Sequence, residues 1–152
     1  MAQPRIGQKV VVDVPATTAN LGPGFDCLGA ALDLNNRFAM RRIEGNGERF
    51  ELIIEGTDGS HLRGGPDNLV YRAAQRVWKA ADMKPVALEA RVRLAVPPAR
   101  GLGSSATAIV AGLMGANALV GEPLSKEKLL ELAIDIEGHP CLLYTSDAAD
   151  EE

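Results

Sequence analysis

The sequence is poor in cysteine and in aromatic residues, and it lacks long apolar runs. Its two cysteines, Cys27 and Cys141, give no disulfide framework and no metal-binding spacing, so a reducing compartment fits them best. No apolar run approaches the roughly 18 residues of a membrane span, and no apolar segment follows a basic start as in a signal peptide. We therefore expect a cytoplasmic protein without a membrane partner.

The sequence also lacks a basic stripe. Aromatic residues make up only 4% of the chain, so nucleic-acid binding has little support. The net charge of −4 comes from residues 141–152, which hold four of the 20 acidic residues and no lysine or arginine, so that 16 acidic residues balance 16 basic ones in the remainder. With 152 residues, of which 46% are hydrophobic, the chain is long and apolar enough for one domain with its own core.

The chain does contain a mixture of strand-like and helix-like segments. Residues 86–96 alternate between apolar and charged positions, which predicts a half-buried strand. Residues 104–120 are almost wholly apolar and small, which predicts a helix that is buried on most sides. Further elements are expected as strands at 9–14 (ending at Pro15), 37–43 and 50–55, a loop of small residues at 16–30, and helices at 68–81 (capped by Asp67) and from Ser125 to about Gly138. This mixture, without a regular βαβ period, predicts an α+β fold.

The strongest chemical signal is the glycine-rich stretch PPARGLGSSAT at residues 97–107. Gly101 and Gly103 permit backbone conformations and close approaches that a β-carbon would block. Ser104 and Ser105 stand where the next helix is expected to start, and a helix N terminus binds anions through its free N–H groups and its dipole. A triphosphate is the anionic ligand that such a helix N terminus would naturally bind. Arg100 adds a charge nearby, although a solvated loop arginine explains it equally well.

The glycine-rich stretch differs from two common nucleotide-binding motifs. It is not G-x-x-x-x-G-K-[ST], since no lysine precedes a serine, and it is not G-x-G-x-x-G, since Ala106 takes the third glycine position. The residues alone therefore predict an anion-binding helix N terminus and do not name the anion.

The same stretch resembles the phosphate loop of the GHMP kinases, which act on galactose, homoserine, mevalonate and phosphomevalonate. The family loop P-x-x-x-G-L-x-S-S-A is matched at Pro97, Gly101, Leu102, Ser104, Ser105 and Ala106. Within this family, residues 14–29 (VPATTANLGPGFDCLG) and the EGHP at 137–140 resemble the homoserine kinases. The resemblance spans residues 9–140. It implies the N-terminal, ATP-binding domain of these kinases, with a fold similar to domain 2 of ribosomal protein S5.

The resemblance implies a role for each matching residue. The loop that would wrap the ATP phosphates consists of Pro97, Pro98, Ala99, Arg100, Gly101, Leu102, Gly103, Ser104, Ser105, Ala106 and Thr107. Ser105 and Glu137 would hold Mg²⁺, for which a hydroxyl and a carboxylate are suitable hard ligands. Asn68, Leu69 and Val70 would line the adenine pocket.

The resemblance also implies the acceptor. Asn20 and Asp26 match residues that contact homoserine, and an anionic Asp26 suits the ammonium group of that substrate; whether Asp26 also accepts the hydroxyl proton stays open. The candidate catalytic residues are thus Asp26, Ser105 and Glu137. The expected reaction is ATP-dependent phosphorylation of the side-chain hydroxyl of L-homoserine in threonine biosynthesis, with a homodimer as the form of the intact parent. Without the resemblance, Asn20 and Asp26 would be ordinary turn residues and Glu137 an ordinary surface carboxylate.

The family pattern breaks after Pro140. The Asp-Asn expected there is replaced by Cys141 and Leu142, and the tail CLLYTSDAADEE resembles translated adapter sequence more than a protein segment. We therefore expect a truncated N-terminal domain at 1–140, a non-native tail at 141–152, and no C-terminal GHMP domain. Since that domain would supply arginines for the substrate carboxylate, we expect this chain alone to show no useful turnover.

Two alternatives to a homoserine kinase stay open. One is another GHMP kinase, acting for example on mevalonate or a sugar. The other is a nucleotide- or anion-binding module without catalysis, which would bind ATP and release no ADP in response to an acceptor.

Overall fold

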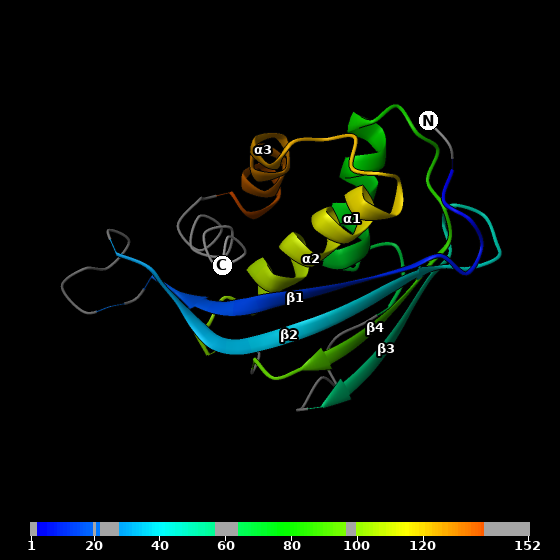
Figure 1. The fold of residues 1–152 in the computed structure, drawn as a ribbon. Coiled ribbons are helices and arrows are strands. Elements are labelled where there is room, and N and C mark those ends of the chain that lie inside the picture. The colour runs from blue at the N-terminus through cyan, green and yellow to red at the C-terminus, as the bar shows by residue number, and fades with distance from the viewer. Residues whose placement is uncertain (1–2, 20, 22–27, 57–63, 97–99, 139–152) are drawn as a thin grey trace.

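The computed structural model describes residues 3–19, 21, 28–56, 64–96 and 100–138, which form a four-stranded sheet with three helices on one of its faces (Figure 1). The strands are β1 (Lys9–Thr18), β2 (Ala30–Arg42), β3 (Phe50–Gly56) and β4 (Leu88–Leu94), and the helices are α1 (Leu69–Ala80), α2 (Ser104–Leu119) and α3 (Lys126–Glu137). This architecture confirms the α+β fold expected from the sequence.

The strands of the sheet lie in the order β1–β2–β4–β3. Strand β2 is antiparallel to both β1 and β4, whereas β3 is parallel to β4, with Phe50 opposite Leu88. Helix α1 lies in the connection between β3 and β4, as expected because parallel neighbours need a crossover. Strands β1 and β3 therefore form the two edges of the described sheet.

Strand β4 confirms the alternation predicted for residues 86–96. Its apolar positions from Leu88 to Leu94 are buried in the core, whereas Arg91 and Arg93 are exposed on the opposite face. Glu89 lies on that opposite face and is nevertheless only 7% exposed.

Two arginines explain how Glu89 is accommodated. Arg41 and Arg91 contact its two carboxylate oxygens at 3.0 and 3.1 Å. Burial raises the pKa of Glu89, and the hydrogen bonds from Arg91 and Arg41 more than offset this, so that the pKa lies below its ordinary value. The carboxylate is thus held in its charged form on the outer face of the sheet.

Strand β1 is longer than the sequence predicted. It was expected to end at Pro15, but it continues to Thr18, with a register shift between Pro15 and Ala16. Proline has no N–H group for a ladder hydrogen bond, and it is tolerated here because β1 is an edge strand with an irregularity at this point.

Strand β2 also begins earlier than predicted. The expected strand at 37–43 in fact starts at Ala30 and ends at Arg42. The expected loop at 16–30 is therefore wrong at both ends, where residues pair with each other across the β1–β2 ladder. Much of the remainder of that predicted loop lies outside the described residues.

Helix α1 packs on the sheet through aromatic side chains. The ring of Tyr71 stacks on Phe50 of β3 with centroids 5.0 Å apart, and it meets Trp78 edge-on at 6.0 Å. Both Tyr71 and Trp78 are fully buried. The tyrosine hydroxyl donates to the carbonyl oxygen of Gly47, so this large side chain keeps a polar partner inside the core.

The N-terminal cap of α1 is one residue later than predicted. Asn68, and not Asp67, is the capping residue, and its side chain accepts a hydrogen bond from the N–H group of Val70 at 3.0 Å. Asparagine and aspartate cap helices about equally well, so residue type alone does not distinguish between the two neighbours.

Helix α2 is buried between the sheet and the other two helices, as its small apolar residues predicted. It contacts β1, β2, α1 and α3 (Figure 1). A Cβ atom on Gly112 would lie 2.4 Å from the carbonyl oxygen of Val70 and 2.7 Å from the Cβ atom of Ala73. Glycine at position 112 therefore lets the backbones of α1 and α2 approach each other closely.

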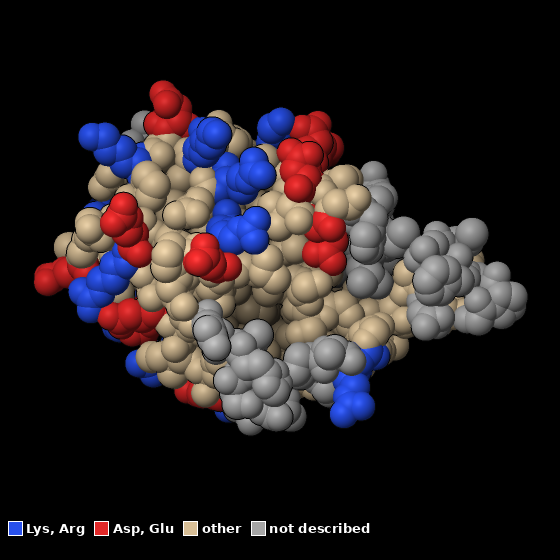
Figure 2. Space-filling model, turned by 180° about the vertical axis from the view of Figure 1, so that it is seen from behind, with Lys and Arg blue, Asp and Glu red and all other residues tan. Residues whose placement is uncertain are grey.

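The surface of the molecule carries charges of both signs. Figure 2 shows acidic and basic side chains interspersed over the face that it draws. Of the helices in the described ranges, none is long and apolar enough to cross a membrane.

Candidate functional site

The glycine-rich stretch leads directly into α2, and no side chain among the described residues caps the N terminus of this helix. The N-cap residue is Gly103, with a left-handed backbone (φ 68°, ψ 29°). The carbonyl oxygen of Gly103 accepts the N–H group of Thr107 at 2.9 Å. Helix geometry leaves the N–H groups of the intervening residues, including Ser104 and Ser105, without an intrahelical acceptor. These N–H groups are the donors that an anion would use.

Strand β1 holds the glycine-rich stretch from the sheet side. The N–H group of Thr17 donates to the carbonyl oxygen of Leu102 at 3.2 Å. A Cβ atom on Gly103 would lie only 2.5 Å from Oγ1 of Thr17, so this position combines a positive φ with a contact that excludes a side chain. The Thr17 hydroxyl itself is buried and has no hydrogen-bond partner among the described residues.

Ser105 and Glu137 meet at the same end of α2. The hydroxyl of Ser105 donates to Oε1 of Glu137 at 3.1 Å, although the two residues are 32 positions apart. Glu137 is the last residue of α3. This helix is flanked by Ser125 as the N-cap residue and by the left-handed Gly138 as the C-cap residue. The structure thus places a hydroxyl and a carboxylate next to the uncapped amides of α2.

The structure also describes Arg100, Leu102, Leu69 and Val70 among the predicted site residues. Arg100 is exposed, and Leu102 is half-buried. The segment expected to line an adenine pocket is the start of α1, where Leu69 is half-buried and Val70 is only 3% exposed. Val70 packs against Gly112 of α2. Gly112 lies nine residues after Gly103, so the two positions are roughly 13 Å apart along the helix axis.

Several predicted site residues lie outside the described residues. They are Asn20, Asp26, Pro97, Pro98 and Ala99. Their roles stay predictions.

The sequence analysis missed Asn36, which is fully buried beside the glycine-rich stretch. Its Oδ1 atom accepts the N–H groups of Ala95 and Val96, each at 2.9 Å, and its Nδ2 group donates to Oγ1 of Thr107 at 3.0 Å. A signal was present, because counting back by twos from the apolar Phe38 places Asn36 on the core face of β2. The strand was expected to start at residue 37, so this polar residue in a core position was overlooked.

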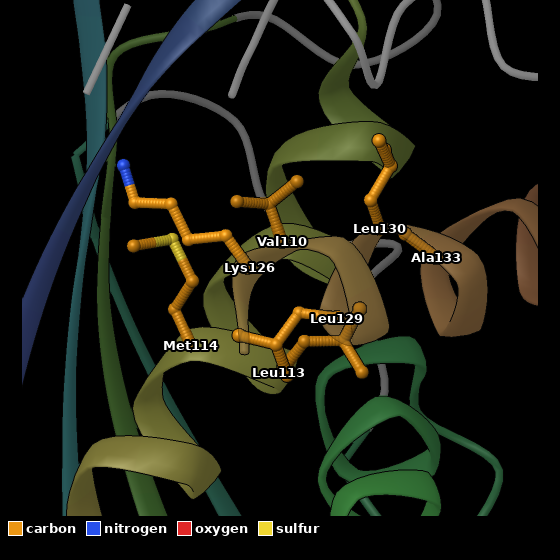
Figure 3. A pocket seen from close by; sticks show the side chains of 7 residues that line it. All are labelled: Val110, Leu113, Met114, Lys126, Leu129, Leu130 and Ala133. Atoms are coloured by element: carbon orange, nitrogen blue, oxygen red, sulfur yellow. The ribbon is translucent and has the colours of Figure 1, made fainter. Parts of the chain in front are cut away.

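An apolar pocket lies between α2 and α3, and its lining includes none of the predicted site residues (Figure 3). Its lining consists of Val110, Leu113, Met114, Lys126, Leu129, Leu130 and Ala133. Apart from Lys126, these side chains offer no polar group, so the pocket is poorly suited to a phosphate. The candidate site is therefore the uncapped end of α2 with the Ser105–Glu137 pair.

Comparison with known families identifies the class of protein. The model of the GHMP kinase N-terminal domain matches residues 68–146, which is more than half of the chain. The chain therefore belongs to the GHMP kinase family and carries the N-terminal domain of these proteins.

The similar curated proteins point to one branch of this family. The chain is 96% identical over 140 residues to a homoserine kinase from Parasynechococcus marenigrum and 95% identical to one from a Synechococcus strain. Each match covers 92% of this chain and 44% of the relative. The chain thus spans less than half the length of the curated relatives that it matches.

Solved structures of the family share the fold. A homoserine kinase from Cytophaga hutchinsonii matches with a TM-score of 0.76 at 26% identity, covering 97% of this chain and 47% of the other. A putative homoserine kinase from Listeria monocytogenes matches with a TM-score of 0.67 at 38% identity, covering 90% and 46%. A mevalonate kinase matches with a TM-score of 0.71 at 14% identity, covering 91% and 51%, which is a likeness of fold alone.

Proposed function

We propose that this chain is the ATP-binding part of a homoserine kinase, which transfers the γ-phosphoryl group of ATP to the side-chain hydroxyl of L-homoserine. The observation that carries the proposal is the uncapped N terminus of α2 beside the Ser105–Glu137 pair. The identity of 96% to a homoserine kinase supports the choice of acceptor.

The α2 N terminus is suited to hold the phosphates of ATP. Its free N–H groups donate hydrogen bonds to phosphate oxygens, and the positive end of the helix dipole lies at the same place. The first turn of α2 carries no acidic residue that would repel them. Arg100, exposed just before the helix, adds positive charge. Phosphoryl transfer depends mainly on such positioning and charge neutralisation, which these groups provide.

Ser105 and Glu137 are suited to hold Mg²⁺. Their oxygens lie 3.1 Å apart. Two adjacent ligands of an octahedral ion with bonds of about 2.1 Å would lie about 3 Å apart, so the observed separation fits. Among the described residues no group of three or more His, Cys, Asp or Glu side chains could hold a metal ion. When bound, Mg²⁺ neutralises charge on the β- and γ-phosphates.

The acceptor part of the proposal depends on residues outside the described ranges. Asn20 would contact homoserine, and Asp26 would bind its ammonium group. The homodimer of the intact protein and the cytoplasmic location likewise stay predictions.

A second GHMP activity is the main competitor. Mevalonate kinase structures share the fold, so the fold does not discriminate between the two acceptors. The identity to homoserine kinases favours L-homoserine.

The proposal is tested on a full-length protein that joins residues 1–140 of this chain to the remaining part of the Parasynechococcus marenigrum relative. ADP release is measured with ATP, Mg²⁺ and a panel of L-homoserine, mevalonate and galactose. We expect turnover with L-homoserine alone. Turnover with another acceptor only would transfer the assignment to that GHMP activity, and ATP binding without any turnover would favour a binding module.

Variants of the same chimera test the Mg²⁺ ligands. We expect Glu137→Gln to lower kcat/KM roughly 100-fold and to raise the Mg²⁺ concentration needed for half-maximal rate, since a metal ion supplies several kcal/mol of charge stabilisation. Glu131→Gln is the matched control, because Glu131 lies on the same helix and pairs with Lys128 at 2.7 Å. An unchanged Mg²⁺ dependence in Glu137→Gln would remove Glu137 from the proposed site.

A further inference from the structure

Four hydrogen bonds connect the end of β4 to the first turn of α2 through two buried side chains. The N–H groups of Ala95 and Val96 donate to Oδ1 of Asn36. The Nδ2 group of Asn36 donates to Oγ1 of Thr107, and the Thr107 hydroxyl donates to the carbonyl oxygen of Ser104 at 2.8 Å. Asn36 and Thr107 are both fully buried.

The partners of Asn36 fix the orientation of its amide group. Its oxygen faces two backbone N–H donors, and its nitrogen faces a hydroxyl oxygen that is itself donating elsewhere. The reversed amide would point its NH₂ group at two donors and leave three polar groups unsatisfied. The side chain is therefore locked in one arrangement.

The position of Asn36 would ordinarily hold an apolar residue. It lies on the core face of β2, opposite Val14 of β1 and two residues before the buried Phe38. Burying an amide there is unfavourable unless its hydrogen bonds are made. A buried asparagine at this position therefore indicates that its hydrogen bonds have a specific structural role.

We propose that Asn36 and Thr107 form a brace that sets the position of the first turn of α2 relative to the end of β4, and thereby positions the anion-binding amides. Ala95 and Val96 come directly before residues 97–103 of the glycine-rich stretch, and Ser104 comes directly after these residues. The brace thus ties together the two ends of this segment. Both side chains are positioning residues, because they are buried behind the helix end and act through the backbone. The link to phosphate binding rests on the proposed function, whereas the link between the two flanks does not.

Amide hydrogen exchange of the 152-residue chain tests the brace. In Thr107→Val the hydroxyl is lost while the side-chain shape is kept, and neither Ala95 nor Val96 contacts the changed atom through a hydrogen bond. We expect the exchange of the Ala95 and Val96 amides to rise roughly tenfold more than that of Val92, the reference amide in β4, because a buried hydrogen bond to Asn36 is lost. Thr107→Ser keeps the hydroxyl and should restore slow exchange.

Asn117 supplies a matched control at the other end of α2. It is a buried asparagine that also bonds backbone groups, donating to the Leu124 carbonyl at 2.9 Å and accepting the Leu124 N–H group at 3.1 Å. In Asn117→Leu we expect faster exchange at Leu124 and no selective change at Ala95 or Val96. Equal effects of the two variants at Ala95 and Val96, or no selective effect in Thr107→Val, would overturn the brace.

Binding of inorganic triphosphate to the same proteins tests the functional link. We expect Thr107→Val to weaken binding roughly tenfold, since the donors are displaced, and Asn117→Leu to change it less than about twofold. If the unmodified chain binds no triphosphate, the proposed function of this fragment fails, while the exchange measurements still decide whether the brace exists. Intact binding in Thr107→Val together with selective exchange would overturn the positioning role.

Discussion

The side chains of Asn68 and Ser125 cap the N termini of α1 and α3, whereas α2 starts at the left-handed Gly103 without a side-chain cap among the described residues. The helices also differ in burial. Helix α1 exposes one charged face, and much of α3 is exposed, but α2 is buried along most of its length.

This difference shows where each helix obtains its stability. A capping side chain contributes about 1 kcal/mol to a helix and accepts one of the free N–H groups of its first turn. Helix α2 lacks the stabilisation from a capping side chain. It is stabilised by the contacts of its small residues with the sheet, α1 and α3. Its first-turn amides have no capping side chain as acceptor among the described residues. The four predictions below test this comparison, from the largest expected effect to the smallest.

Gly112→Ala should destabilise the protein by about 3 kcal/mol, at the upper end of overpacking costs, because its Cβ atom would meet the Val70 carbonyl oxygen at 2.4 Å. The free energy of unfolding is measured by denaturant titration. The matched control is Gly115→Ala on the same helix, whose Cβ atom would meet the flexible end of Met40 at 2.3 Å. Because this side chain can move, we expect a loss of less than about 1 kcal/mol. Equal losses would mean that α2 is not anchored by its contact with the α1 backbone.

Gly103→Ala should cost about 2 kcal/mol, of which the positive φ accounts for about half and the contact with Thr17 for the rest. The control is Gly121→Ala, just beyond the other end of α2, which has a φ of +85° and nothing within 4 Å of the added Cβ atom. Denaturant titration should give a loss of about 1 kcal/mol for this control. Only Gly103→Ala should weaken triphosphate binding, and equal binding by both variants would separate the anion site from Gly103.

Asn68→Ala should lower the stability by about 1 kcal/mol, through loss of the cap on α1, while Asn68→Asp should change it little. Thermal unfolding followed by circular dichroism measures both effects. An alanine variant as stable as the original chain would show that α1, like α2, depends on packing alone.

Acid should affect the start of α3 through Glu127. A hydrogen bond from the Ser125 side chain holds the pKa of Glu127 below its ordinary value of 4.5. A lowered pKa in the folded state means that the contribution of Glu127 is present above pH 4.5 and is lost as the pH falls through the folded-state pKa. An NMR titration should place the midpoint of Glu127 below 4.5 and show that Ser125→Ala raises it. A midpoint at or above the ordinary value would contradict the hydrogen bond between Ser125 and Glu127.

The sequence predicted the elements with strong local patterns. The alternation at 86–96 and the run of small residues at 104–120 correspond to β4 and α2, because burial requires those patterns. The start of β2 was missed because Asn35 and Asn36 are residue types common in turns, and only the pairing with β1 and the partners of Asn36 make this segment a strand. Tertiary contacts of this kind leave little trace in a local pattern.

The candidate site was predictable to a similar degree. The residues of 97–107 alone indicated an anion-binding helix start, and the structure shows an uncapped helix there. The pairing of Ser105 with Glu137 came only from the family resemblance, since nothing in a carboxylate at the end of a helix specifies a hydroxyl 32 residues away. The support from Thr17 and Asn36 was not foreseen, because both act from other strands.

The hydrogen bonds of Asn36 also bear on the order in which the protein folds. They join residues 59, 60 and 71 positions apart in the chain, and contacts of such long sequence separation form slowly because large loops must close first. We therefore expect the start of α2 to gain its final shape after β2 has paired with β4. An isolated peptide of residues 95–107 would contain every glycine and serine of the motif but neither Asn36 nor Thr17, so we expect it to lack the proposed anion site.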